Sequence, residues 1–424
     1  MRSPRRTVLG YLLVPRPKDL IKGLSVPFAF GIGALAAGGT SHEQVLRALV
    51  VWAALELLVY PARYQWNDIR GFVADQQHPN AQDRGRLPGP LDRARERVLA
   101  SSAVALARLA TAAGLVLMLP TLQLGGEIAA VTAAVFGVAM VYETLRARAT
   151  GCTGRVPPPL RPALVGLWLV VGAGYAIRGI TGLALAVDLA GQPLLGAAAV
   201  VTLWSFGVAF VSGRWALEAL AFARLEGRRV IWSARSEQAR EHSLALVRWL
   251  PTEIPTQDLP HVTGREAADW PALRGRTRIS APWNVAALFA GTAAALTGRL
   301  LTGPTPATAA LLAAGSGAVT AAAVLAVPRR RGAAVLLGAA ALAVVFAVSG
   351  AARPGIAMLP WLAVLGAHVV STRQSLSSMG QPLRPAGRLI RAALVPIGRA
   401  AVGRATWAVL AAPDGERSDE VAQR

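Results

Sequence analysis

The chain has 424 residues, of which 54% are hydrophobic and only 16% charged, and its mean hydropathy is +0.44. Soluble domains carry about 25% charged residues, and their helices normally keep a polar face, so this composition argues against a soluble fold. The formal net charge of +21 does not indicate nucleic-acid binding, because the arginines recur between apolar runs instead of forming one basic domain. Positive cytoplasmic loops in contact with anionic lipid give this pattern.

Apolar runs of about 20 residues, each long enough to cross a bilayer as a helix, follow one another along the chain. They predict an all-α fold, a polytopic membrane helical bundle with 9–10 transmembrane helices. The predicted spans are about 23–40, 44–62, 98–119, 124–143, 162–186, 193–213, 282–302, 305–327, 332–350 and 355–371. The expected organisation is an N-terminal segment (1–22), a transmembrane domain (23–371) with cytoplasmic loops 63–97 and 214–280, and a basic amphipathic tail (372–424).

Positive charge alternates between the connections. The N-terminal segment, the even connections and the tail are rich in arginine, whereas the odd connections PTLQLGGE and VDLAGQP have no basic residue. The positive-inside rule therefore predicts a multi-pass protein of the cell membrane with both termini and all polar connections in the cytoplasm.

The sixth connection and the tail are the longest segments outside the spans. RWALEALAFARLEGRRVIWSARSEQAREHSLALVRWL has helical spacing, which predicts that the sixth span continues into the cytoplasm as a helix before turning back. In the tail, the spacing of apolar residues predicts a helix on the inner leaflet; these are Leu389, Ile390, Ala393, Leu394 and Ile397. The single cysteine, Cys152, excludes an intrachain disulfide, and five scattered histidines argue against zinc or haem.

The polar stretch YQWNDIRGFVADQQHPNAQDRGRLPGP, residues 64–90, follows the second predicted span. Asp68 and Asp75 are seven residues apart, which places both on one face of a helix, and Asn67 adds a neutral oxygen. Carboxylates at a membrane boundary suit Mg²⁺ shared with substrate phosphates, and Arg84 and Arg86 suit phosphate binding. Together they predict a diphosphate site for a molecule with a charged head and an apolar tail, an isoprenyl diphosphate. The alternative is a solvated loop whose charges only fix the topology.

NDIRGFVAD resembles the first aspartate-rich motif of the UbiA superfamily of membrane prenyltransferases, Asn-Asp-x-x-Asp-x-x-x-Asp. Asn67, Asp68 and Asp75 match it, and Gly71 stands where the middle Asp is expected. The position after the second span and the later Arg84 and Arg86-Leu87-Pro88 are also similar to the family pattern. The resemblance covers roughly residues 15 to 230 by motif order, and the family usually has nine spans against the ten counted here.

Further likenesses lie around the fourth to sixth spans. The resemblance places Tyr142, Arg146, Arg148 and Arg178 at the family's functional positions. Arg178 lies inside a predicted span, where charge usually serves function, although snorkelling to an interface is the alternative. The second aspartate motif is not matched: Asp is absent from 189 to 257, and Glu218 and Glu226 are the nearby acids that could replace it as metal ligands. The alternative is that both only pair with neighbouring arginines.

The resemblance implies a Mg²⁺-dependent enzyme that ionises an isoprenyl diphosphate and transfers the prenyl group to an acceptor, with Asn67, Asp68, Asp75, Tyr142 and Arg178 as catalytic residues. Arg84, Arg86, Arg146 and Arg148 would bind substrate, and Asp68, Asp75, Glu218 and Glu226 would hold metal. One alternative is a terpene cyclase acting on the same diphosphate. Another is a non-catalytic lipid-binding or transport protein of the same fold, and a phosphatidyl-type alcohol transferase ranks last because Asp-Gly-x-x-Ala-Arg is absent. The residues do not identify a protein partner.

Overall fold

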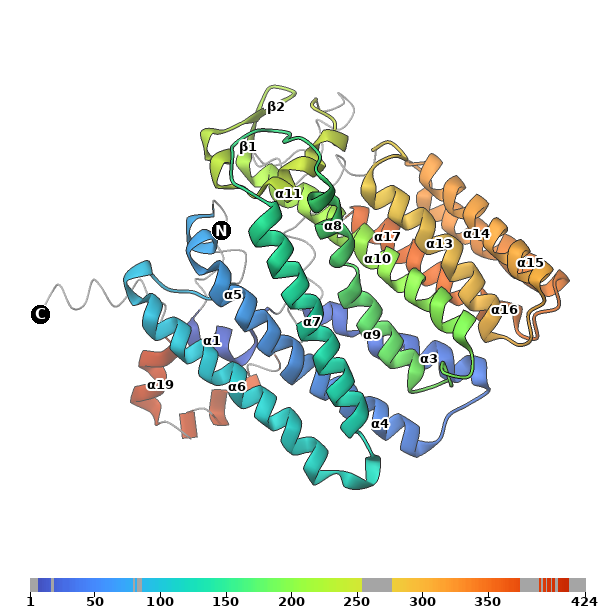
Figure 1. Ribbon diagram of the computed structural model, residues 1–424, viewed down its shortest axis with the longest axis horizontal. Coiled ribbons are helices and arrows are strands. Elements are labelled where there is room, and N and C mark those ends of the chain that lie inside the picture. The colour runs from blue at the N-terminus through green and yellow to red at the C-terminus, as the bar shows by residue number, and fades with distance from the viewer. Residues whose placement is uncertain are drawn as a thin grey trace, which may run out of the picture. The chain divides into compact units, whose positions relative to one another are not determined.

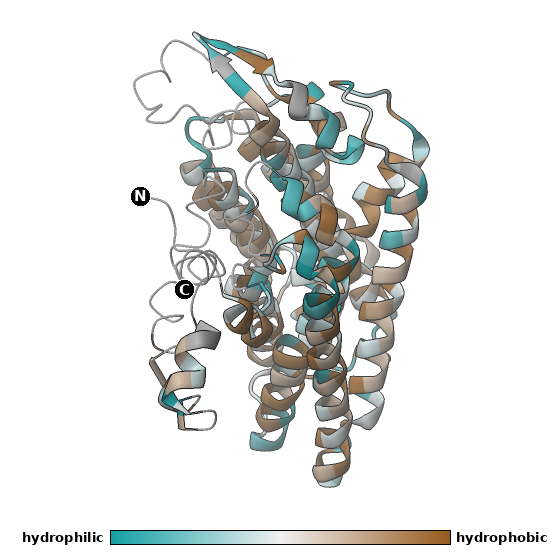
Figure 2. Cartoon of the chain, turned by 90° about the vertical axis from the view of Figure 1, so that its left-hand side faces the viewer, coloured by the Kyte–Doolittle hydropathy of each residue, from teal (hydrophilic) through white to brown (hydrophobic). Residues whose placement is uncertain are grey.

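The computed structural model describes residues 7–16, 19–78, 81, 86–253 and 277–373, and in the tail 389, 392–393, 395–397, 399–400 and 403–411. Within these residues nine helices are long and apolar enough to cross a membrane, which confirms the predicted polytopic membrane helical bundle. They are His42–Gln77, Leu91–Met118, Gly125–Arg148, Pro162–Ala184, Pro193–Phe222, Pro282–Leu301, Ala307–Ala326, Arg331–Val348 and Pro354–Arg373. A shorter apolar helix, Ile21–Ala37, corresponds to the first of the ten predicted spans. Apolar residues run along most of these helices (Figure 2).

The chain forms two compact units. The first contains Met1–Ile21, Ala53–Thr132 and Ser377–Arg424, and the second contains Lys22–Trp52 and Ala133–Leu376.

The first unit centres on two helices that pack against each other, α5 (Tyr60–Gln77) and α6 (Ala94–Met118). A short helix, α1 (Val8–Leu13), contacts α6 and α19 (Arg404–Ala411). α5 continues without a break from α4 (His42–Ala53), which belongs to the second unit up to Trp52, and a π-helical segment (Ala54–Val59). The whole helix spans 36 residues. At 1.5 Å per residue this helix is about 54 Å long, against about 30 Å of bilayer hydrocarbon. Its polar second half, with Asp68 and Asp75, therefore extends well past the apolar first half.

The second unit is the larger helical body, in which α10 (Pro193–Ala219) packs along α13 (Pro282–Leu301). α13 also contacts α14 (Ala307–Ala326) and α17 (Leu359–Arg373), and α15 (Arg331–Val348) contacts both of these (Figure 1). On its other side α10 contacts α9 (Ala173–Ala184), which in turn packs against α3 (Ser25–Ala37). The remaining helices here are α2 (Leu20–Gly23, which bridges the two units in sequence), α7 (Gly125–Ala149, which begins in the first unit), α8 (Pro162–Val170) and α16 (Pro354–Ala357).

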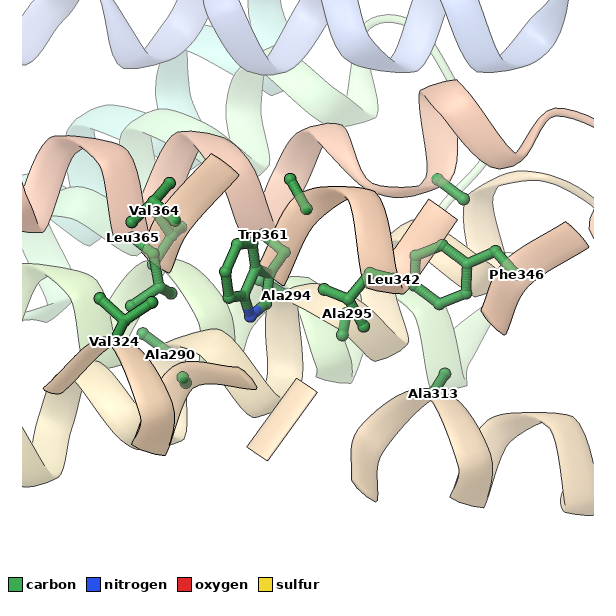
Figure 3. Close-up of a cluster of buried hydrophobic side chains, with 14 of the residues drawn as sticks. Ala290, Ala294, Ala295, Ala313, Val324, Leu342, Phe346, Trp361, Val364 and Leu365 are labelled. Atoms are coloured by element: carbon green, nitrogen blue, oxygen red, sulfur yellow. The ribbon is translucent and has the colours of Figure 1, made fainter. Parts of the chain in front are cut away.

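The core of α13–α17 is built mainly from small side chains around one large one. Trp361 is fully buried and lies among alanines and a few larger apolar residues, which Figure 3 labels as Ala290, Ala294, Ala295, Ala313, Val324, Leu342, Phe346, Val364 and Leu365. At Gly298 the backbone of α13 comes so close to α16 that a Cβ would lie 1.7 Å from the Ala357 carbonyl oxygen. In a membrane, helices associate by close contact of small residues, since lipid offers no hydrophobic drive. Ala and Gly at these positions therefore hold the bundle together.

The sixth connection differs from the prediction. The helix continues only to Ala219, and a 3-10 turn (Leu220–Phe222) follows. The chain then forms an antiparallel hairpin of β1 (Ala223–Glu226) and β2 (Arg229–Trp232) (Figure 1), 3-10 turns over Ala234–Gln238 and Ala245–Trp249, and the short α11 (Glu241–Leu244). The predicted helix is wrong beyond Phe222, because Val230 and Trp232 pack against a core formed with α8 and α10. Tertiary packing thus overrides the local helical spacing.

One buried carboxylate fastens this segment to the loop between α7 and α8. Glu241, 1% exposed, accepts hydrogen bonds from the Gly151 backbone N–H at 3.0 Å, Thr153 Oγ1 at 3.0 Å and Arg161 Nη2 at 3.1 Å. Hydrogen bonds to a charged acceptor are the stronger kind. Residues 151–161 and α11 therefore form one connected cap at the start of α8 and the end of α10.

The predicted tail helix lies mostly outside the described residues. Among its apolar positions Leu389, Ala393 and Ile397 are helical, whereas Ile390 and Leu394 fall outside. The stretch PTEIPTQDLPHVTG, residues 251–264, whose prolines and glycine predict turns, also lies mostly outside the described residues.

Candidate functional site: the Asp68 cluster

The first aspartate motif lies on α5. Asp68 is fully buried, Asn67 is 9% exposed, and the Asp75 side chain is 12% exposed. The helix places Asp68 and Asp75 two turns apart on one side, as their spacing predicts.

Asp68 is held by three residues from outside its own helix. It accepts hydrogen bonds from Tyr11 Oη at 3.1 Å, from Arg16 Nε at 3.4 Å and through a short contact with Arg16 Nη2, and from Arg86 Nη1 at 2.9 Å. Tyr11, Arg16, Asp68, Asp75 and Arg86 are called the Asp68 cluster below. Its buried carboxylate is compensated by two guanidinium groups and a phenol, as a buried charge requires.

Arg86 connects the two aspartates. While Nη1 donates to Asp68, its Nε lies 3.8 Å from Asp75 Oδ2. Two carboxylates two turns apart thus converge on one cationic group. The chain after α5 is positioned for this contact, because Gln76 Nε2 donates to the Leu87 carbonyl at 2.7 Å and Leu87 packs with Tyr11 and Phe72.

Gly71 explains how Asp75 reaches Arg86. A Cβ at position 71 would lie 3.0 Å from Asp75 Oδ2, so the Asp75 carboxylate occupies the space beside Gly71. An aspartate at position 71, as in the family pattern, would compete for that space. Arg84, the other predicted arginine of this loop, lies outside the described residues.

The sequence pattern does not predict two residues of the cluster, Tyr11 and Arg16, because the basic N-terminal segment indicates only a topology-setting charge. Nor does the pattern predict Arg108 in α6, which donates to Gln65 Oε1 at 2.5 Å and to the carbonyls of Leu12 and Leu13 at 2.7 and 2.8 Å. Arg108 thereby satisfies the carbonyl end of α1, the helix that carries Tyr11. An arginine in the middle of an apolar run was the available signal.

Burial and neighbouring charges determine the protonation states of Tyr11 and Arg16, the two cluster residues from the N-terminal segment. Burial raises the pKa of Tyr11, and the Asp68 charge raises it further, so the phenol stays neutral and donates. For Arg16, burial lowers the pKa, but the carboxylates of Asp68 and Asp19 outweigh it and the pKa is raised, so Arg16 is charged. The Arg16 guanidinium also lies 4.8 Å from the centre of the Tyr64 ring, a cation–π contact.

The remaining predicted site residues belong to the second unit. Arg146 lies 5.7 Å from the Tyr142 ring and pairs with buried Glu143 at 2.8 Å, and the Tyr142 ring is 6.3 Å from that of Trp215. Arg148, two residues on, is exposed. These residues form a smaller polar group at the end of α7.

Arg178 and the two glutamates lie on separate elements of the second unit. Arg178 is 2% exposed in α9 and donates to the Gly174 carbonyl at 3.3 Å. Glu218 pairs with Arg214 at 3.2 Å one turn earlier on α10, whereas Glu226 pairs with Arg224 at 2.6 Å on the exposed hairpin. Within the described part of the chain, no three His, Cys, Asp or Glu residues come together as a metal site.

Comparison with known proteins identifies no relative, since no family model, curated protein or solved structure matches the chain.

Proposed function

We propose that this chain is a membrane-embedded prenyltransferase of the UbiA type, which acts on an isoprenyl diphosphate with Mg²⁺. The observation that carries the proposal is the convergence of Asp68 and Asp75 on the guanidinium of Arg86. A cationic group already stands between the two carboxylates, and a second arginine, Arg16, binds the same cluster. Carboxylates for a metal and arginines for phosphate, at the polar end of an apolar helix, are the groups that such a substrate needs.

The donor set fits one metal ion shared with substrate. Asp68 and Asp75 offer hard oxygen ligands, and Mg²⁺ usually completes its shell with water and substrate phosphate. A second metal on Glu218 and Glu226 has no such support, because each pairs with its own arginine on a different element.

When bound, Mg²⁺ would supply stabilisation of the negative charge that develops on the diphosphate. Asp68 and Asp75 would hold the metal, while Arg16 and Arg86 turn from Asp68 to the phosphate oxygens and bind them. Tyr11 would keep donating to Asp68 and so fix its orientation. Tyr142, Arg146, Arg148 and Arg178 enter the proposal through the family resemblance alone.

The proposal includes an orientation in the membrane. Both termini and the Asp68 cluster would face the cytoplasm of the cell, because the basic connections alternate with connections free of positive charge.

A non-catalytic lipid-binding or transport protein is the second candidate. The full burial of Asp68 and its donors from three residues favour it, because an ion-pair network that is already satisfied needs no ligand.

The test is release of diphosphate from geranyl, farnesyl or geranylgeranyl diphosphate by purified protein in detergent, with and without Mg²⁺. We expect Mg²⁺-dependent release that Asp75→Asn lowers by about 100-fold or more. Asp92→Asn, which changes an exposed aspartate of the same unit, serves as the control and should act as wild type. If no chain length gives release, or if Asp75→Asn releases as much as wild type, the enzyme proposal fails. Product analysis with and without an added acceptor separates transfer from cyclisation.

A further inference from the structure

An arginine in the second unit is buried without adequate compensation. Arg331, the first residue of α15, is 2% exposed. Its Nη2 lies 3.4 Å from the carbonyl oxygen of Leu325 in the last turn of α14. Its other nitrogens, Nε and Nη1, are buried and have no hydrogen-bond partner within the described residues. A buried guanidinium in this state is costly unless an acceptor joins it.

A second positive charge nearby adds to the free-energy cost of burying the Arg331 guanidinium. Arg373, the last residue of α17, reaches the start of α15, where a Cβ at Gly332 would lie 3.9 Å from Arg373 Nη2. The positive charges of Arg331 and Arg373 repel one another. The sequence has no Asp or Glu between residues 270 and 413, so α13, α14, α15, α16 and α17 cannot supply a carboxylate. Two neighbouring guanidinium groups thus lie at one end of a bundle that lacks acids.

The backbone at this point also favours an anion. α15 has 18 residues, and the residue before it, Arg330, makes no side-chain hydrogen bond to cap it. The first amides of a helix and its dipole attract negative charge. The unmet donors of Arg331, the charge of Arg373 and the start of α15 therefore point to the same kind of ligand.

We propose that Arg331 and Arg373 bind a phosphate group at the start of α15, carried by an anionic phospholipid or free in solution. Arginine binds phosphate through several hydrogen bonds at once. A basic site at the end of membrane-spanning helices is where lipid headgroups lie. The site belongs to the second unit and shares no residue with the Asp68 cluster, so it does not depend on the proposed prenyl transfer.

The experiment compares the thermal midpoint of the full chain in nanodiscs of phosphatidylglycerol and of phosphatidylcholine. A third arm adds inorganic phosphate to phosphatidylcholine nanodiscs, against chloride at equal ionic strength. We expect wild type to melt about 4 °C or more higher with phosphatidylglycerol, because a ligand that binds the folded state stabilises it. A shift with inorganic phosphate as well supports the site and identifies free phosphate as a sufficient ligand.

Arg331→Met should abolish this shift, and Arg330→Met, which removes an exposed charge from the neighbouring position, should keep it. In phosphatidylcholine without phosphate, Arg331→Met should melt at or above the wild-type temperature, because an uncompensated buried charge is gone. A purely structural role for Arg331 predicts a lower midpoint in every arm. If Arg331→Met fails to fold, Arg373→Gln at an exposed residue should show the same loss of shift.

The proposal is overturned if wild type melts at one temperature in all arms. It is also overturned if Arg330→Met loses the shift as completely as Arg331→Met, which would indicate general surface charge.

Discussion

Replacing Asp68 by Asn tests whether the buried carboxylate is what holds the N-terminal segment onto α5. Asn has nearly the same shape but no charge, so Arg16 and Arg86 would keep their positions and lose their closest counter-ion, leaving only Asp19 at 3.9 Å from Arg16 and Asp75 at 3.8 Å from Arg86. Both are poorly exposed, with side chains 10% and 20% accessible, and Asp68 itself is fully buried. Removing one partner of a buried ion pair costs about 3–5 kcal/mol, because the other charge stays buried and unpaired. We expect a loss of stability in that range for Asp68→Asn.

The size of the direct interaction comes from a double-mutant cycle with Arg16→Met. Met keeps the apolar length of the side chain and removes the charge. Arg16 contributes two of the four hydrogen bonds that Asp68 accepts, so the two changes should be strongly non-additive. We expect the double variant to be more stable than the sum of the single losses by about 1–3 kcal/mol.

The assay is thermal and denaturant unfolding of purified protein in one detergent, followed by intrinsic fluorescence. Asp75→Asn provides the comparison: Asp75 is partly exposed and lies 3.8 Å from Arg86, so its loss should cost well under 1 kcal/mol. Additive single losses, or an Asp68→Asn variant as stable as wild type, would refute the reasoning. A large stability effect at Asp68 together with a large activity effect at Asp75 would separate the structural role from the proposed catalytic one.

Three further predictions concern helix packing, the hydrogen bonds by which Glu241 fastens the loop between α7 and α8, and the membrane topology. Gly298→Ala should destabilise the bundle by about 3 kcal/mol or more, seen as a lower thermal midpoint, because the new Cβ would lie 1.7 Å from the Ala357 carbonyl oxygen. Glu241→Gln should loosen the loop that follows α7, because the amide keeps only one acceptor oxygen and removes the negative charge that pairs with Arg161, and trypsin should then cut that loop faster. Cys152, the only cysteine and exposed, should react with a membrane-impermeant maleimide only after the cells are opened, because its loop is predicted to be cytoplasmic.

Matched variants control these experiments. Gly315→Ala, where nothing lies within 4 Å of the new Cβ, should leave the midpoint unchanged; an equal loss there would contradict the packing argument. Glu127→Gln, far in sequence from Glu241 and from the loop that it fastens, should leave trypsin cleavage of that loop unchanged. Cys152→Ser with Ala190→Cys moves the thiol to a connection predicted to be outside, where intact cells should be labelled; the reverse pattern would invert the topology.

The sequence by itself determined the membrane helices and the spacing of the first motif. Apolar length and helical periodicity are local properties, so the long spans and the common face of Asp68 and Asp75 could be predicted without knowing any partner. The local pattern did not predict the structure where tertiary packing determines it. The segment after Phe222 has helical spacing but forms a hairpin, because Val230 and Trp232 join a core built by α8 and α10.

Only the tertiary structure decided what the motif residues touch. Tyr11 and Arg16 reach Asp68 from 57 and 52 residues away, and no period in the sequence links them. The same holds for Arg331, whose position at the end of the basic run 329–331 suggests an exposed, topology-setting charge, although the bundle encloses it. A charge in the sequence has a sign and a position, but its burial and its partners depend on which helices pack together, and that is fixed only when the chain folds.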